Sequence, residues 1–99
     1  MIKLEIKPFG EGFLLLQINL DKPIQPSDLP SVEFPKAQGK GLIISGRAPI
    51  WLYCYVFHYY LHLFRVIAIY DPKLQGAIIV ASHDPEYEVG NIIPLVEGV

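Results

Sequence analysis

Residues 41–70 run GLIISGRAPIWLYCYVFHYYLHLFRVIAIY, in which two apolar runs enclose a long segment rich in tyrosine and histidine. The two runs, residues 41–45 and 66–70, are apolar without alternation, which is typical of strands covered on both faces. Pro49 suits the first turn of a helix, and no further helix breaker follows before residue 63. This order of strand, helix and strand predicts a βαβ unit with parallel strands.

The flanking segments predict the rest of a sheet. Residues 2–7 alternate charged and apolar side chains, and residues 13–18 follow a glycine-containing turn, so they predict an antiparallel hairpin at one sheet edge. Residues 21–40 are interrupted by prolines and predict a connection without a long helix or a central strand. Residues 77–81 predict a strand that returns antiparallel, because the turn at residues 71–76 is too short for a crossover. The expected class is therefore α/β, with a βαβ core and an antiparallel hairpin.

Composition indicates a single domain that spans residues 1–99. A chain of 99 residues is too short to form two cores. With 52% hydrophobic and 18% charged residues it is also too apolar to be disordered. This apolar content exceeds what one small core hides, so we expect self-association into at least a dimer.

Charge and cysteine content exclude several classes of protein. The net charge is −2, from 8 basic and 10 acidic residues, which argues against a surface for duplex DNA or long RNA. Any nucleotide ligand is therefore expected to be small and locally held. The lone Cys54 excludes an internal disulfide and fits a cytoplasmic location. Residues 48–64 are uncharged, but they are short and contain Pro49 and two histidines, so we expect no membrane segment. Residues 1–7 carry too many charged side chains for a secretion signal.

The predicted helix, residues 49–63, carries no charged side chain. Its side chains form two neighbouring stripes at helical spacing. The first consists of Ile50, Cys54, Phe57 and Leu61, and the second of Trp51, Tyr55, His58 and His62. An uncharged helix is normally buried on most sides, which in so small a protein favours a homodimer seam. The alternative is a helix covered by its own chain.

The loop between the first strand and the helix is a candidate anion site, because ligands collect beyond the carboxyl ends of parallel strands. Its residues are Ser45, Gly46, Arg47, Ala48 and Pro49. Gly46 permits close approach of a backbone, the helix start offers N–H groups, and Arg47 adds a forked cation suited to phosphate. An ordinary strand-to-helix turn is the alternative. No Gly-x-Gly-x-x-Gly or Walker pattern occurs, which argues against dinucleotides and nucleoside triphosphates.

Two groups of polar residues are expected at opposite ends of the sheet. The first, which we call the arginine end, comprises Ser45, Arg47, Asp71 and Lys73, and the second, the histidine end, comprises His62, Arg65 and His83. This placement follows because parallel strands end at one edge and the crossover helix runs back to the other. At ~1.5 Å per helical residue, His62 lies on the order of 20 Å from Ser45 in one chain. A ligand that both ends contact therefore requires two molecules.

A catalytic triad and a histidine metal site are both disfavoured. A Ser45, His62 and Asp71 triad is disfavoured by this separation and by the lack of a nucleophile-elbow motif. His58 and His62 have the spacing of a metal pair, but they lie among bulky aromatics with no carboxylate nearby in sequence. A structural role for His58, a helix-dipole role for His62 and a solvated turn position for His83 are the alternatives.

Three blocks carry a family resemblance: residues 41–52 (GLIISGRAPIWL), residues 66–73 (VIAIYDPK) and residues 77–83 (AIIVASH). They resemble the third Csx-type accessory protein of type III CRISPR systems, and the resemblance extends over residues 2–96. It implies a small, dimeric, Rossmann-like domain of the CRISPR-associated type. It further implies a ring nuclease that cleaves cyclic tetra-adenylate, sandwiched between two dimers stacked head to tail, with help from manganese. In the family this cleavage switches off the antiviral signal.

Carried over by position, the family's catalytic histidine corresponds to His62, and its catalytic aspartate, a possible manganese ligand, corresponds to Asp71. The family's later histidine corresponds to His83. Lys73 stands where the family commonly has arginine, and it keeps the charge but loses the bidentate fork. Ala48 replaces a glycine that often follows the loop arginine. The alternative function is a module that senses cyclic oligoadenylate or short RNA without cleaving it.

Overall fold

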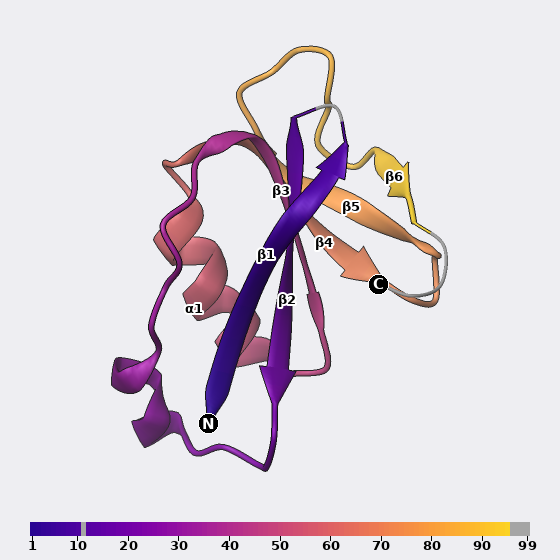
Figure 1. The fold of residues 1–99 in the computed structure, drawn as a ribbon. Coiled ribbons are helices and arrows are strands. Elements are labelled where there is room, and N and C mark those ends of the chain that lie inside the picture. Colours follow the sequence, from indigo (N-terminus) through magenta and orange to yellow (C-terminus); the bar gives the residue numbers. More distant parts are fainter. Residues whose placement is uncertain (11, 96–99) are drawn as a thin grey trace.

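The computed structural model describes residues 1–10 and 12–95, which form one six-stranded sheet with a single α-helix (Figure 1). The elements are β1 (Ile2–Gly10), β2 (Phe13–Leu20), a 3-10 helix η1 (Pro26–Ser31), β3 (Gly39–Gly46), α1 (Ile50–Tyr60), β4 (Phe64–Asp71), β5 (Gly76–Ser82) and β6 (Ile92–Pro94). The strands lie in chain order across the sheet. β2, β3 and β4 are mutually parallel, whereas β1, β5 and β6 pair antiparallel with their neighbours.

The central βαβ unit is confirmed. β3 pairs parallel with β4, with Gly41 opposite Val66, and α1 makes the connection between them. The apolar run of β3 is buried on both faces, since Leu42, Ile43 and Ile44 are all fully buried. The α/β class, the hairpin of β1 with β2 and the antiparallel return of β5 are confirmed as well.

A second parallel crossover was not foreseen. β2 is parallel to β3, and residues 21–38 connect them. This connection packs on the same sheet face as α1, because both contribute apolar side chains to one core with β2 and β3 (Figure 1). Right-handed crossovers that advance in one direction across a sheet fall on one face. The strand order therefore lacks the reversal of a doubly wound sheet, and the Rossmann-like expectation holds only for the βαβ unit.

The opposite face of the sheet has an apolar half and a polar half. Phe13, Leu15 and Ile43 belong to a second core, to which Tyr87 and Leu95 contribute from the segment that follows β5. Further along the same strands the alternation continues with polar side chains, namely Gln17 and Asn19 on β2 and Ser45 on β3. The polar half lies at the carboxyl ends of the parallel strands.

The helix is shorter than predicted. It ends at Tyr60, and the next residues turn: the Leu63 N–H donates to the Tyr60 carbonyl at 3.0 Å, and the Gly39 N–H donates to the Leu63 carbonyl at 3.2 Å. Phe64 then enters the sheet with only 4% of its surface exposed. Burial of this ring starts β4 at residue 64, so His62 lies in the turn after the helix and not in its last turn.

The helix packs on its own sheet through a stripe that the sequence analysis did not select. Leu52, Val56 and Tyr60, spaced four residues apart, are fully buried. The two stripes expected at a dimer seam are only partly free of this contact: Ile50 is 81% exposed and Trp51 37% exposed, whereas Phe57 and Leu61 pack against the core. The homodimer itself stays a prediction. Among the residues described, no helix combines the length and apolar character needed to cross a membrane.

An aromatic cluster attaches the connection to the helix. Phe34 stacks on Tyr59 at 3.9 Å between ring centroids and meets Tyr60 edge-on at 5.9 Å. The Tyr60 hydroxyl donates a hydrogen bond of 2.6 Å to the Pro35 carbonyl. Burial, reinforced by the neighbouring Tyr59, raises the pKa of Tyr60 to about 12. This neutral hydroxyl secures the path of residues 21–38 over the helix.

Candidate functional site

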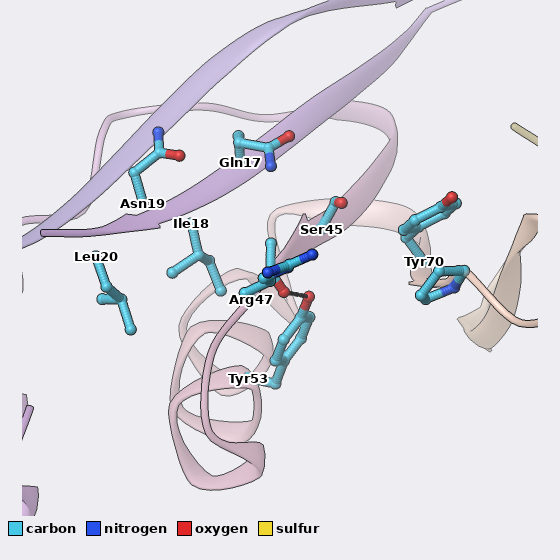
Figure 2. Close-up of a pocket in the computed structure, with 10 residues that line it drawn as sticks. Gln17, Ile18, Asn19, Leu20, Ser45, Arg47, Tyr53 and Tyr70 are labelled. Atoms are coloured by element: carbon cyan, nitrogen blue, oxygen red, sulfur yellow. Dashed lines mark hydrogen bonds between the residues drawn. The ribbon is translucent and has the colours of Figure 1, made fainter. Parts of the chain in front are cut away.

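A cavity of about 490 Å³ opens at the carboxyl ends of the parallel strands (Figure 2). It is lined by Gln17, Ile18, Asn19, Leu20, Ser45, Gly46, Arg47, Tyr53, Tyr70 and Pro72. Its size lies within the range of small-molecule sites, roughly 300–1,000 Å³. The cavity forms where sheets with parallel strands place their ligands, and it contains the loop that the sequence indicated.

Gly46 shapes the floor of this cavity. The φ of Gly46 is +129°, a backbone conformation that residues other than glycine rarely adopt. A Cβ at this position would lie 2.9 Å from both the nitrogen and the Cβ of Ile18, and it would overlap the Ile18 carbonyl oxygen. Only glycine fits, and the chain therefore turns tightly against β2.

Tyr53 fixes the peptide that follows Gly46. Its hydroxyl donates a hydrogen bond to the Gly46 carbonyl, drawn as a dashed line in Figure 2. Burial raises the pKa of Tyr53, so the hydroxyl keeps its proton at neutral pH. Because the carbonyl and N–H of a trans peptide point in opposite directions, the Arg47 N–H faces away from Tyr53. The backbone N–H of Arg47 is thereby held in one orientation.

The loop residues divide between cavity and core. Arg47 is exposed, and it forms no hydrogen bond or ion pair with any residue that the structure describes. Ser45 is 1% exposed and belongs to the cavity wall. Ala48 packs against the core on the helix side, and the Pro49 carbonyl accepts the N–H of Leu52 at 3.0 Å. Ser45, Gly46 and Arg47 are thus available to a ligand, whereas Ala48 and Pro49 start the helix and do not line the cavity.

Three lining residues were missed from the sequence: Gln17, Asn19 and Tyr70. The sequence predicts the hairpin of β1 with β2 but does not identify β3 as the other neighbour of β2, so it does not bring the polar positions of β2 next to the loop after β3. The available signal was the pair of amides, two residues apart, in an otherwise apolar strand. The Asn19 Nδ2 donates to Glu5 Oε1 at 2.8 Å across the hairpin.

Asp71 and Lys73 flank this cavity in the turn between β4 and β5. The Asp71 Oδ1 accepts the backbone N–H of Lys73 at 2.9 Å, and the Asp71 carbonyl accepts that of Leu74 at 3.1 Å. Asp71 is half-buried and Lys73 is exposed. Both adjoin Pro72, which lines the cavity. The turn therefore belongs to the arginine end.

The histidine end is a second, smaller cavity of about 300 Å³. It is lined by Gly39, Leu61, His62, Leu63, Phe64, Arg65 and His83. The Arg65 Nη2 donates to the His83 carbonyl at 2.6 Å, while the His83 N–H donates to the Arg65 carbonyl at 2.8 Å. The structure thus brings both histidines and one arginine together where β4 begins and β5 ends.

The length of β4 separates the two ends. Arg65 and Asp71 are six residues apart on this strand, and at ~3.3 Å per residue that distance is about 20 Å. His62 and Asp71 of one chain therefore cannot share a hydrogen bond. The same separation excludes a triad of Ser45, His62 and Asp71.

The donor set of one chain does not fit a manganese site. No cluster of three or more histidine, cysteine, aspartate or glutamate residues occurs within residues 1–10 and 12–95. Asp71 is a lone carboxylate whose Oδ1 already accepts an N–H. Manganese needs several oxygen or nitrogen ligands, and neither Asp71 nor the pair of His58 and His62 supplies them.

These features define a small α/β protein with a polar cavity that Arg47 lines at one end of its sheet, and with two histidines in a smaller cavity at the other end. A family model described as CRISPR-associated protein (Cas_csx3) matches residues 17–94. An uncharacterized protein from Aquifex aeolicus (strain VF5) is 33% identical over 98 residues, covering 94% of this chain and 87% of that relative. The chain belongs to the Cas_csx3 family of CRISPR-associated proteins, and its role is CRISPR-associated.

Proposed function

We propose that this protein is a ring nuclease, which binds cyclic tetra-adenylate between two dimers, cleaves it and so switches off the signal of a type III CRISPR system. The observation that carries the proposal is the division of functional groups between two ends about 20 Å apart along β4. One end offers a cation and oriented backbone N–H groups for phosphate. The other offers two imidazoles, the side chains best suited to proton transfer near neutral pH.

The chemistry needs no covalent protein intermediate. The ribose 2′-oxygen attacks the adjacent phosphorus, and the bond from phosphorus to the 5′-oxygen breaks. The 2′-hydroxyl must lose a proton and the 5′-oxygen must gain one, while the phosphate accumulates negative charge. In this proposal His62 transfers the proton, with His83 beside it. Arg47 and Lys73 contact the phosphate oxygens, and Asp71 orients the imidazole that reaches it from the second dimer.

The assembly follows from the separation of the ends. A ligand that contacts His62 and Asp71 together takes the histidine end from one dimer and the arginine end from another. Such head-to-tail contact is heterologous, so it yields a tetramer and extends into a filament when it repeats. The uncharged outer face of α1, with Ile50 and Trp51 exposed, supports the dimer that this stacking requires.

The test is incubation of the purified protein with cyclic tetra-adenylate, with and without manganese, followed by chromatography for linear di-adenylate. Formation of the linear product supports the proposal, and dependence on manganese would indicate that the assembled complex, unlike one chain, holds a metal. Tight binding without any product instead identifies a sensor that does not cleave, an alternative that Lys73 in the place of the family's arginine favours.

Affinity is tested with Arg47→Ala. Loss of its charge-assisted hydrogen bonds is expected to weaken binding by roughly 1.5–3 kcal/mol in calorimetry. Lys7→Ala is the matched control, because it removes the same charge from an exposed residue of the edge strand β1 that lines neither cavity. Equal affinities of the two variants would remove Arg47 from the site.

A further inference from the structure

Gln17 occupies the middle of the polar half of the sheet. It lies on β2, opposite Glu5 of β1 and opposite Ser45 of β3. Figure 2 shows its side chain on the same side of β2 as Asn19, whereas Ile18 and Leu20 point to the other side. Gln17 is half-buried in the cavity wall. Its amide group therefore belongs to the surface that a ligand in the cavity meets.

The side-chain amide of Gln17 has no hydrogen-bond partner among the residues that the structure describes. Gln17 forms no side-chain hydrogen bond with any residue in the described ranges 1–10 and 12–95, whereas the neighbouring Asn19 donates to Glu5. No buried side-chain nitrogen or oxygen of the described residues lacks a partner, so the unpartnered amide of Gln17 is accessible from the cavity. Gln17 thus presents an adjacent donor and acceptor to the cavity.

The rest of the wall offers what the other parts of a nucleotide require. Arg47 provides a cation for the phosphate, and Tyr70 provides an aromatic ring on which a base stacks. A glutamine amide pairs with adenine in a bidentate manner, since its oxygen accepts from N6 and its nitrogen donates to N7. Phosphate, stacking and base-edge contacts are thus available within one cavity.

We infer that Gln17 is a specificity-determining residue, whose amide selects an adenine base in this cavity. The inference rests on the proposed function, because it assigns a base-reading role within the same site. Hypoxanthine carries an oxygen in place of the 6-amino group, so the Gln17 oxygen would face a second acceptor. A good bidentate contact contributes about 5- to 150-fold in discrimination between bases.

The test compares the affinity for cyclic tetra-adenylate with that for cyclic tetra-inosylate, which differs only in the bases. The wild-type protein is expected to prefer the adenine ligand by at least about 5-fold. Gln17→Leu should bind both ligands equally, and Gln17→Arg, with two donors in place of a donor and an acceptor, should prefer inosine. Asn19→Leu is the matched control, because it removes an amide that is already bonded to Glu5, and it should keep the adenine preference.

The possible outcomes distinguish a failure of the role of Gln17 from a failure of the proposed function. Equal wild-type affinity for the two ligands, or full adenine preference in Gln17→Leu, overturns the role of Gln17 and leaves the proposed function intact. Because the wild-type comparison needs no variant, a folding defect in Gln17→Arg does not obscure it. If neither ligand binds the wild-type protein, the proposed function fails, and the base-reading role fails with it.

Discussion

Mixing two inactive variants tests whether one active site is built from two dimers. His62→Ala should lower the cleavage rate by about 10²- to 10⁴-fold, the usual loss for a proton-transfer group, and Asp71→Ala should be nearly inactive as well, because it removes the group that orients the imidazole. His62 lies in the turn before the 8-residue strand β4 and Asp71 is the last residue of that strand, so each variant keeps one end of the sheet intact. An equal mixture therefore contains junctions at which an intact histidine end meets an intact arginine end.

The recovery can be calculated from the geometry of the stack. Half of the dimers in the mixture have an intact histidine end, and the other half have an intact arginine end. When head-to-tail stacking is random, both ends are therefore intact at about one junction in four. The assay is the rate of linear di-adenylate formation immediately after mixing, measured over a range of protein concentrations. Recovery should approach about a quarter of the wild-type rate at high concentration, and it should rise with concentration, because stacking is second order in dimer.

The control replaces Asp71→Ala in the mixture with the double variant that carries both substitutions, which supplies neither end. This mixture should stay inactive. The reasoning is refuted if the mixture of single variants is equally inactive at every concentration. It is refuted as well if a structure of the complex places His62 and Asp71 of one chain within hydrogen-bond distance.

Three further predictions concern the fold and the assembly. Gly46→Ala should lower the free energy of unfolding by about 2–4 kcal/mol in urea titrations, because it combines backbone strain with overlap at Ile18. Gly90→Ala is the control, since its backbone is strained but the space around it is open, and it should lower the free energy of unfolding by only about 1–2 kcal/mol. Equal losses in the two variants would contradict the overlap at Ile18. Ile50→Glu should give a folded monomer in sedimentation where the unmodified protein is a dimer, and a monomeric unmodified protein would contradict the seam. The pKa of Tyr60 is about 12 in the folded protein, whereas that of an unfolded tyrosine is near 10. The contribution of Tyr60 to stability should therefore be fully present below pH 10 and decrease as the pH rises from 10 to 12, by at most about 2–3 kcal/mol. Tyr60→Phe should remove most of this alkaline loss, and an unchanged pH profile in that variant would contradict the assignment.

The sequence predicted those parts of the structure that local pattern determines. The apolar runs around Ile43 and Ile67 identify buried strands, and the helix between them makes those strands parallel. The loop at Arg47 and the histidine end then follow from topology alone. The end of the helix was mispredicted, because the aromatic residues up to Phe64 continue a helical pattern and only tertiary burial of that ring ends it. The catalytic and ligand-binding roles of these residues stay predictions.

Gln17 was missed for a different physical reason. The proline-interrupted connection in residues 21–38 has no periodicity, so it does not show whether β3 lies beside β2 or elsewhere in the sheet. Its path is set by tertiary contacts, among them the ring of Phe34 on Tyr59 and the hydroxyl of Tyr60 on Pro35. Without that neighbour relation, the amides of β2 are surface residues of a hairpin and not the wall of a cavity.

The order of strands in the sheet determines how this chain can fold. Within residues 1–10 and 12–95, each strand after β1 pairs with the strand that precedes it in the chain, so none of these pairings has to wait for a later segment. Loops that close between neighbours cost less chain entropy than distant ones, which favours rapid folding. During synthesis each strand emerges after its partner and can add to the growing edge of the sheet. Deletion of β6 would then remove only the last addition, whereas deletion of β3 would separate two halves that have no other pairing between them.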